Sequence, residues 1–289
     1  RAIISLELGF RSALAALYAR CTGTRLAIWS YQSRVSSQQS WLRKQWRGLL
    51  LKQAHTVIGM GTQAREVLTS WGVPDEKIVD APNAADHQTL MQRFHSPAAQ
   101  AAVQRIKERH APHQKLAIVV GRLVPLKGTE HILQAWKRLP QATRAEWKLV
   151  FVGSGPLQPL IEAEDSQQIE WAGSVSPATI ADWYRAADLH IFPSCGDVWG
   201  LVVNEASACA TPSLCSVHAA CCDDLIQQGR SGFKLDLSDA DTADAQLRTA
   251  LNHPDLAEVG RAAQALIADY SIDNMANGLR QAVTRMTSG

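Results

Sequence analysis

Two cations in one short segment, Arg122 and Lys127, have the residue types and spacing to do chemistry. They follow the apolar run 116–120, which predicts a buried β-strand, so both lie in the loop at its carboxyl end. A diphosphate leaving group develops negative charge as its bond breaks, and preorganised cations stabilise such charge. The pair therefore indicates a diphosphate-binding loop, although two basic residues in a loop often contact only solvent.

Two carboxylates, Asp197 and Glu205, flank a segment that predicts a helix starting near residue 200. Such a helix places Glu205 two turns in and Asp197 just ahead of it, so both could face one ligand. The amides of Gly200 and Leu201 would point out of the helix N-terminus, which favours anions. Glu205 lies among apolar residues and needs a partner, which two sugar hydroxyls would supply. The alternative for Asp197 is a capping residue of this helix.

The elements that must position these residues alternate between strand and helix. The pattern predicts strands at 116–120, 149–152, 170–172, 189–192, 213–215 and 232–235, with helices at about 128–139, 156–165, 177–187, 200–209 and 219–228. This alternation favours right-handed parallel crossovers and a sheet covered on both faces. Ligands of such sheets bind beyond the carboxyl ends of the strands. Gly121, Gly153 and Gly155 follow strand ends, where a small residue lets a ligand approach the backbone.

A second set of elements precedes this series, and further helices follow it. The pattern predicts strands at 2–6, 26–29, 55–59 and 77–80, helices at 10–20, 36–53 and 62–71, and final helices at 241–252, 254–269 and 273–286. Residues 84–114 are polar and helical with no strand. We interpret them as a connection between two α/β domains.

Composition supports two globular domains and excludes several classes of function. The 289 residues suffice for two domains at roughly 150 residues each. The net charge of +2 gives no electrostatic case for nucleic acid. No apolar run reaches the roughly 18 residues of a membrane span. The six cysteines lack zinc-ligand spacing, so we expect reduced, half-buried thiols in a cytoplasmic protein.

Several common motifs are absent or have a simpler interpretation. Gly153-Ser154-Gly155-Pro156 lacks the spacing of a dinucleotide fingerprint, and neither a P-loop nor a Gly-x-Ser-x-Gly elbow occurs. We interpret His190 as a core histidine. The segment 41–47 places two tryptophans among three cations. This is typical either of a membrane-surface helix or of an exposed basic helix with one buried tryptophan.

Six motifs, taken in order, resemble the donor domain of the retaining GT-B glycosyltransferases of family 4, the glycosyl transferases group 1. The resemblance covers about residues 115–235. A segment at 81–86 resembles the crossover between the two domains of that family. The motifs are Gly121-Arg122-Leu123 with Lys127-Gly128, Gly153-Ser154-Gly155-Pro156, Trp171-Ala172-Gly173, Trp183-Tyr184-Arg185-Ala186-Ala187-Asp188-Leu189, Phe192-Pro193-Ser194, and Asp197-x7-Glu205-Ala206.

The resemblance implies an α/β protein of GT-B fold, in which two Rossmann-like domains face each other across a nucleotide sugar. It implies a partial acceptor-side domain at 1–90, a connection at 91–114 and a donor-binding domain at 115–270. A C-terminal helix at 271–289 would return to the first domain. The front half of the first domain would then lie outside this sequence. The family needs no bound metal, so the resemblance implies no metal or other cofactor, and the nucleotide-diphospho-sugar is the donor substrate.

The resemblance also implies roles for individual residues. Arg122 and Lys127 would hold the diphosphate, Glu205 would hydrogen-bond the ribose, and backbone near Val175 would meet the base. The expected catalytic residues are Arg122, Lys127, Asp197 and Glu205, and the expected donor-binding residues are Gly121, Gly153, Gly155, Val175, Ser194, Val198, Trp199, Gly200 and Leu201.

Four departures separate this sequence from the family pattern. Asp197 stands where the family has a glutamate, Ala210 where it has a glycine, and Ala220-Cys221 where it has two glycines. We expect these residues to crowd or re-aim the donor sugar. In the first domain, Ser30-Tyr31 replaces a histidine that is frequent in the family, so no catalytic helper is predicted there.

The function implied is hexosyl transfer with retention, in glycan or polysaccharide biosynthesis. The expected partners are a nucleotide sugar and a glycan or lipid-linked acceptor, and no nucleic acid. The expected location is the cytoplasm, at the inner face of the membrane if segment 41–47 binds there. The alternatives are a non-catalytic nucleotide-sugar-binding fragment or partner subunit, and another GT-B enzyme such as a nucleotide-sugar epimerase or a sucrose-synthase-like transferase.

Overall fold

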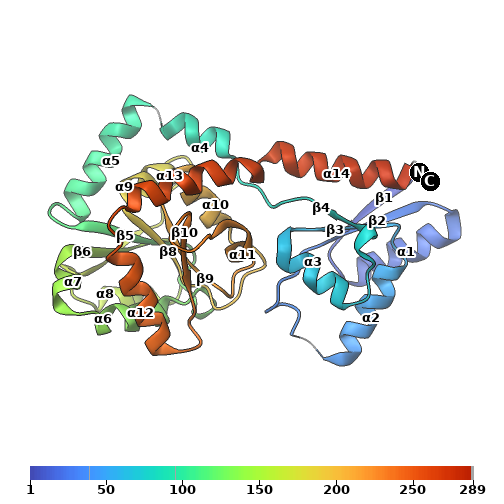
Figure 1. Cartoon of the computed structure of the whole chain (residues 1–289), viewed down its shortest axis with the longest axis horizontal. Helices are drawn as coiled ribbons and strands as arrows, with labels where there is room; N and C mark the ends of the chain where they lie inside the picture. Colours follow the sequence, from blue (N-terminus) through green and yellow to red (C-terminus); the bar gives the residue numbers. More distant parts are fainter. Residues whose placement is uncertain (39, 95, 288–289) are drawn as a thin grey trace. The chain divides into compact units, whose positions relative to one another are not determined.

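Two parallel sheets organise the chain, each in its own unit (Figure 1). The computed structural model describes residues 1–38, 40–94 and 96–287. By their contacts, these residues form unit 1, which comprises Arg1–Ala84, Asp197–Trp199 and the segment from Asp269 onward, and unit 2, which comprises Ala85–Gly196 and Gly200–Ala268. The α/β class predicted from the alternating pattern is confirmed.

The sheet of unit 2 has six parallel strands in the order β10-β9-β8-β5-β6-β7. They are β5 (Lys115–Val120), β6 (Trp147–Val152), β7 (Ile169–Gly173), β8 (Leu189–Phe192), β9 (Ser213–Ser216) and β10 (Gly232–Leu235). The order reverses between β5 and β8, because β6 and β7 follow on one side and β9 and β10 on the other. Doubly wound sheets bind ligands at such a reversal, beyond the carboxyl ends of the strands.

Helices cover both faces of this sheet. They are α4 (His87–Phe94), α5 (Pro97–His110), α6 (Thr129–Arg138), α7 (Gln141–Glu146), α8 (Gln158–Glu162), α9 (Ile180–Ala186), α10 (Leu201–Ala208), α11 (Cys221–Leu225), α12 (Ala240–Leu251) and α13 (Leu256–Ile267). Successive residues of β5 enter different apolar cores. Val119 belongs to the core that contains Trp136 of α6, and Ile118 to the core that contains Trp183 of α9. Both faces of the strand are therefore buried, as parallel sheets require.

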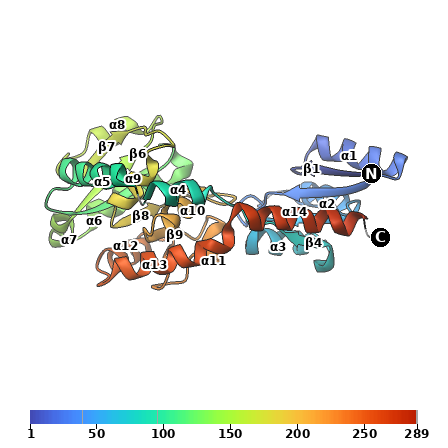
Figure 2. The ribbon, with the colours of Figure 1, turned by 90° about the horizontal axis from the view of Figure 1, so that it is seen from above.

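Unit 1 has a four-stranded parallel sheet in the order β1-β2-β3-β4. Its strands are β1 (Ala2–Leu6), β2 (Arg25–Ser30), β3 (Thr56–Gly59) and β4 (Ile78–Asp80), and its helices are α1 (Phe10–Thr22), α2 (Trp41–Lys52), α3 (Gly61–Ser70) and α14 (Ile272–Thr287). Helix α14 lies along this sheet in both views (Figures 1 and 2) and contacts β2, β3 and β4. Its residues Ala282 and Met286 are buried with Ile58 of β3. One face of the sheet is therefore covered by a helix that comes last in the chain.

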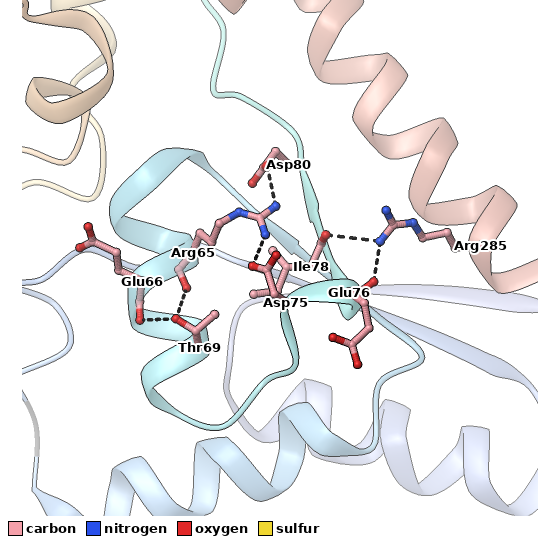
Figure 3. A network of polar contacts seen from close by, with 8 residues as sticks. All are labelled: Arg65, Glu66, Thr69, Asp75, Glu76, Ile78, Asp80 and Arg285. Carbon is pink, nitrogen blue, oxygen red and sulfur yellow. Dashed lines mark hydrogen bonds and ion pairs between the residues drawn. The ribbon is translucent and has the colours of Figure 1, made fainter.

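Polar contacts fix the edge strand β4 between two helices (Figure 3). Arg285 of α14 donates to the carbonyl oxygen of Glu76 at 2.8 Å, in the short turn before β4. Arg65 of α3 donates to Asp80 at 2.6 Å and also pairs with Asp75. These contacts tie α14 and α3 to the same strand.

The predicted elements agree with the structure except at five helices: α2, α7 and α8, described below, α9, which begins three residues later than predicted, and α11, which spans five residues where ten were predicted. All the predicted strands are present, with ends that shift by at most two residues. Helix α2 begins at Trp41 and not at residue 36, because Ser33 and Ser36 accept from each other's amides in a turn. Helix α8 is shorter than predicted, because the Leu157 amide donates to the carbonyl oxygen of Leu123. Helix α7 was not predicted.

The segment interpreted as a connection forms α4 and α5. Helix α5 contacts α9, and Val103 and Ile106 pack against the core that contains Trp183. By their contacts, both helices group with unit 2. No helix in residues 1–38, 40–94 and 96–287 is long and apolar enough to cross a bilayer.

The burial of His190 and of the cysteines was predicted from the sequence. His190 is a core histidine as predicted: burial lowers its pKa to about 3, and Nδ1 lies 3.0 Å from the Ser213 hydroxyl. The cysteines are free thiols but are not uniformly half-buried. Cys21 is exposed and Cys195 is intermediate, whereas the remaining four, Cys209, Cys215, Cys221 and Cys222, are buried.

Candidate functional site

A cavity of about 590 Å³ lies beyond the carboxyl ends of β5 and β6 and beside the segment that follows β7. All its lining residues belong to unit 2. The ends of β5 and β6 supply Val120, Gly121, Arg122, Val152, Gly153 and Ser154. The segment after β7 and the start of α9 supply Ser174, Val175, Pro177 and Ile180. The start of α4 supplies Ala85, Asp86, Thr89 and Leu90, and α10 supplies Glu205.

Five of the predicted site residues line this cavity together. They are Gly121, Arg122, Gly153, Val175 and Glu205. The Arg122 side chain is exposed, and its guanidinium has no hydrogen-bond or ion-pair partner within the described residues. A cation without an internal partner at a strand end can bind an anionic group of a ligand.

Glu205 has a partner that the sequence did not predict. The hydroxyl of Tyr184, from the fully buried face of α9, donates to Glu205 Oε2 at 2.9 Å. Burial raises the pKa of Glu205, and the hydrogen bond from Tyr184 opposes that rise. In the part of the chain that the structure describes, Tyr184 is the only hydrogen-bond partner of this carboxylate. Oε1 can therefore accept a hydrogen bond from a ligand.

Tyr184→Phe is expected to lower the free energy of unfolding by about 1–3 kcal/mol, because it leaves the half-buried carboxylate of Glu205 without its donor. The substitution should raise the pKa of Glu205 further, since only burial then acts on it. The loss should therefore grow as the pH rises through that raised pKa and shrink in acid, where the carboxyl group is protonated. Urea unfolding at several pH values measures this.

The matched control is Tyr18→Phe, at a tyrosine that is 52% exposed. It removes the same hydroxyl from a side chain that has no buried carboxylate beside it. A loss in Tyr184→Phe that is independent of pH, or equal to that of the control, would contradict the role of Tyr184 as the partner of Glu205.

Lys127 does not line the cavity, although we expected it to share one hollow with Arg122 and Glu205. Its Nζ lies 5.4 Å from the centre of the Phe192 ring, at the end of β8. Gly200 approaches the same ring, because a Cβ added there would lie 2.6 Å from Phe192 Cε1. Lys127 and the N-terminus of α10 therefore both lie close to Phe192, at the end of β8, the strand next to β5.

The loop that carries Arg122 and Lys127 is tied to the end of β8. The amide of Cys195 donates to the carbonyl oxygen of Leu126 at 2.9 Å, and the Ser194 hydroxyl donates to the same oxygen at 3.3 Å. Ser194 is fully buried and bonded to the loop itself, and it is not among the residues that line the cavity. Gly155 likewise packs against this loop, because an added Cβ would lie 2.3 Å from the Leu123 carbonyl oxygen.

Gly128→Ala is expected to destabilise the protein by roughly 1–3 kcal/mol more than Gly229→Ala. Both glycines have a left-handed backbone, with φ of +71° and +73°, so an alanine is strained equally at each. A Cβ at position 128 would lie 1.8 Å from the carbonyl oxygen of Pro193, whereas position 229 has nothing within 4 Å. Urea unfolding of the two variants measures the difference. Equal losses would show that the loop moves away from β8 at no cost.

Asp197, Val198 and Trp199 group with unit 1 and do not line the cavity. Trp199 is buried, and its ring lies 6.0 Å from that of Tyr270. Its amide donates to Asp197 Oδ1 at 3.3 Å. Helix α10 begins at Leu201 after Gly200, so Asp197 is not its capping residue. Glu205 is the fifth residue of this helix, which is less than the two full turns expected.

Two of the departures from the family pattern lie at opposite ends of α10. Ala210 follows its C-terminal end with φ of +56°, a left-handed conformation that costs an L-residue roughly 1–2 kcal/mol. Ala210 therefore strains the end of the helix. Cys221 lies beside the N-terminal end, because a Cβ added to Gly200 would lie 3.2 Å from its Sγ.

The sequence reasoning missed the wall that α4 contributes. Asp86 accepts from the Thr89 amide at 3.1 Å and from its hydroxyl at 2.7 Å, and these bonds lower the pKa of Asp86. Arg93 fixes α4 to α9, since its Nε donates to the buried Asp182 at 2.9 Å. An aspartate three residues before a threonine is the spacing of a helix N-cap, which was the available signal.

The cavity combines three kinds of chemical group. Val152, Val175 and Ile180 are apolar and can pack against a flat ring. Glu205 can accept from hydroxyl groups, and Arg122 can bind an anion. A ligand with a ring, hydroxyl groups and an anionic part fits these walls. The cavity lies where the strand order reverses, which is the usual position of a ligand site in doubly wound sheets.

Comparison with known proteins points to one family. The family model described as "Glycosyl transferases group 1" matches residues 101–283. A D-inositol 3-phosphate glycosyltransferase of Thermobispora bispora is 31% identical over 211 residues, which are 67% of this chain and 47% of that protein. The sulfoquinovosyl transferase SQD2 of Arabidopsis thaliana is 28% identical over 158 residues, 53% of this chain and 30% of that protein. The chain thus spans less than half the length of either relative.

Solved structures share the fold. HepE of Anabaena, solved in complex with UDP-glucose, has a TM-score of 0.72 at 16% identity, covering 96% of this chain and 76% of that one. Sucrose-phosphate synthase from Thermosynechococcus elongatus has a TM-score of 0.78 at 19% identity, covering 99% of this chain and 74% of that one. These likenesses agree with the GT-B fold expected from the sequence, with one Rossmann-like sheet in each unit.

Proposed function

Because the chain belongs to the glycosyl transferases group 1, we propose that it moves a hexose from a nucleotide-diphospho-sugar to a hydroxyl of a glycan or lipid-linked glycan, with retention. Unit 2 would bind the donor and unit 1 would serve the acceptor. The observation that carries the proposal is the cavity of unit 2, which joins Arg122, Glu205 and apolar walls at the carboxyl ends of adjacent strands.

Each wall of the cavity has a role in this proposal. Glu205 Oε1 accepts from a ribose hydroxyl, while Tyr184 holds Oε2. The base lies against the apolar segment around Val175. Arg122 faces the diphosphate, and its charge is available because no described side chain pairs with it.

The chemical step requires stabilisation of the leaving group. As the bond from sugar to phosphate breaks, negative charge grows on the diphosphate oxygens. Arg122 would bind that charge directly, and Lys127 and the first amides of α10 would add positive potential around Phe192. The proposal thus gives side chains and helix amides the neutralising role and needs no bound cofactor.

The relatives suggest which donor to test first. The structure of HepE contains UDP-glucose, and its fold is shared by this chain. We therefore propose UDP-glucose as the first donor, with GDP-glucose and ADP-glucose beside it. A ligand that binds only the folded protein raises its thermal midpoint, so a thermal-shift series ranks the three.

The proposed reaction is tested by following free UDP and the sugar together in the whole protein. Transfer predicts that UDP appears in proportion to a glycosylated acceptor, and that the product keeps the α or β configuration of the donor in its proton NMR spectrum. An altered sugar that is still attached to UDP would indicate epimerisation. Nucleotide binding without turnover across a panel of acceptors would indicate a non-catalytic subunit. An inverted product would contradict retention.

A further inference from the structure

Helix α4 lines the cavity through one of its faces. Thr89 and Leu90 are lining residues, and Arg93 follows them by four and three positions. Residues at these spacings are neighbours on the surface of a helix, so Arg93 continues the lining face by one turn. Leu90 also packs against the apolar core that contains Trp183 of α9. The place of α4 therefore determines where this wall of the cavity stands.

A second wall comes from α9 and from the segment before it. Ile180, the first residue of α9, and Val175 line the cavity and pack against the same core as Leu90. Tyr184, one turn further along α9, donates to Glu205 at 2.9 Å. Helix α9 thus contributes an apolar wall and also holds the carboxylate of the site.

A pair of charged side chains joins these two helices. Arg93 donates to Asp182 of α9 through Nε, at 2.9 Å, and also through Nη2. The side chain of Asp182 is only 4% exposed, whereas that of Arg93 is 32% exposed. A contact at two points between a guanidinium and a carboxylate fixes orientation as well as distance. The pair therefore fixes the spacing between α4 and α9.

We propose that Arg93 is a positioning residue of the donor site, and that its pair with Asp182 sets the width of the space that receives the nucleotide base. The inference rests on the proposed function, which names a nucleotide as the occupant of the cavity. Leu90, Val175 and Ile180 are the apolar lining residues against which a flat base can pack. Arg93 and Asp182 are not lining residues, so they act on the ligand through the two helices.

The burial of Asp182 makes the pair costly to break. Without Arg93, a charged carboxylate stays in a place from which water is excluded, which is strongly unfavourable. The carboxylate can regain water only if α4 moves away from α9, and Leu90 then moves with the helix. Removal of both charges takes this penalty away. We therefore expect the loss of one partner to disturb the cavity more than the loss of both.

Isothermal titration of the whole protein with UDP tests the inference. Arg93→Gln should weaken UDP binding about tenfold, a usual size for the coupling between residues of one network. Arg93→Gln with Asp182→Asn should bind UDP more tightly than Arg93→Gln alone, because no buried charge is left unpaired. Arg93→Lys keeps a charge beside Asp182 but cannot bond at two points, so its loss should be smaller. It replaces Arg93→Gln if the thermal midpoint shows that Arg93→Gln is not folded at the temperature of the titration.

The matched control is another arginine–aspartate pair of unit 2. Arg138 of α6 donates to Asp244 of α12 through Nε at 2.6 Å and through Nη2 at 2.8 Å, and neither residue lines the cavity. Arg138→Gln removes the same kind of contact between two helices and should bind UDP as the parent protein does. An equal loss of affinity in Arg138→Gln and Arg93→Gln would indicate general destabilisation and overturn the inference.

Kinetic constants separate positioning from catalysis. The wall formed by α4 contacts the donor before and during the reaction, so Arg93→Gln should raise the KM for the donor and leave kcat near that of the parent protein. Arg122→Ala should act mainly on kcat. A fall in kcat with an unchanged KM in Arg93→Gln would contradict the positioning role.

The preference among nucleotides is a readout that a merely structural role would not change. A wider space should favour a purine over the smaller uracil, so the ratio of the UDP to the GDP dissociation constant should rise in Arg93→Gln and not in Arg138→Gln. An unchanged affinity and an unchanged ratio in Arg93→Gln would overturn this inference and leave the proposed function intact. A parent protein that binds none of UDP, GDP and ADP would overturn the proposed function, and the inference with it.

Discussion

Arg122→Ala is expected to lower the turnover of the whole protein by roughly 100-fold or more. Arg122 lines the cavity at the end of β5, and its guanidinium has no partner among the described side chains. In the proposed reaction it binds the diphosphate as negative charge grows there, and a donor used in the transition state acts mainly on kcat. With alanine at this position, only water can stabilise the negative charge on the diphosphate. Lys127→Ala should produce a loss of similar size if the cation over Phe192 contributes to the same stabilisation.

The matched control for Arg122 is Arg230→Ala, which removes an exposed arginine of the same unit that does not line the cavity. Turnover of the control should be near that of the parent protein. Thermal midpoints should be unchanged in both variants, because both side chains are exposed. Near-normal turnover in Arg122→Ala and Lys127→Ala alike would remove both residues from the mechanism.

Glu205→Gln is expected to weaken nucleotide binding by roughly 10–100-fold, the value of a hydrogen bond to a charged group. Glutamine keeps an oxygen that can accept from the Tyr184 hydroxyl, so the internal contact at 2.9 Å survives. What is lost is the charged acceptor that faces the cavity. Isothermal titration with UDP measures the affinity. Glu162→Gln on α8, an exposed position, is the control and should bind UDP as the parent protein does.

The same substitution should stabilise the ligand-free protein at neutral pH. Burial raises the pKa of Glu205, so the folded state disfavours the charged carboxylate more than the unfolded state does. The stability that this group contributes is fully present below its unfolded pKa and is lost as the pH rises through its folded pKa. Glu205→Gln should therefore raise the thermal midpoint at pH values above the folded pKa of Glu205. At pH values below the unfolded pKa it should leave the midpoint unchanged. A variant that is less stable at neutral pH would show that the carboxylate is not strained by burial.

The order of strands and helices could be predicted from the sequence because each buried strand is a short apolar run, as in the stretch 115–120. Helix ends were harder, because they depend on contacts between distant residues. Helix α8 is short because Leu157 bonds to Leu123, which belongs to the loop after another strand. Helix α7 follows Pro140 and has no buried residue, so its sequence lacks an apolar period.

The candidate site, like the fold, could be predicted from the sequence only in part. Strand ends located Gly121, Arg122 and Gly153, since parallel topology alone places them at one edge. Tyr184 was missed because its role depends on how α9 packs against α10, which no local pattern encodes. Lys127 was expected beside Arg122 because they share a loop, but only Arg122 lines the cavity, and Lys127 Nζ lies over the ring of Phe192.

The placement of α14 determines when unit 1 can be completed during synthesis. Its sheet is built from residues near the start of the chain, yet the apolar cluster around Ile58 includes Ala282 and Met286. All residues of unit 2 are synthesised before α14, so the strands of unit 1 leave the ribosome early. One face of their sheet stays uncovered until α14 has been synthesised. During that interval the nascent chain exposes Ile58 and its neighbours, whereas unit 2 can fold as soon as α13 has emerged.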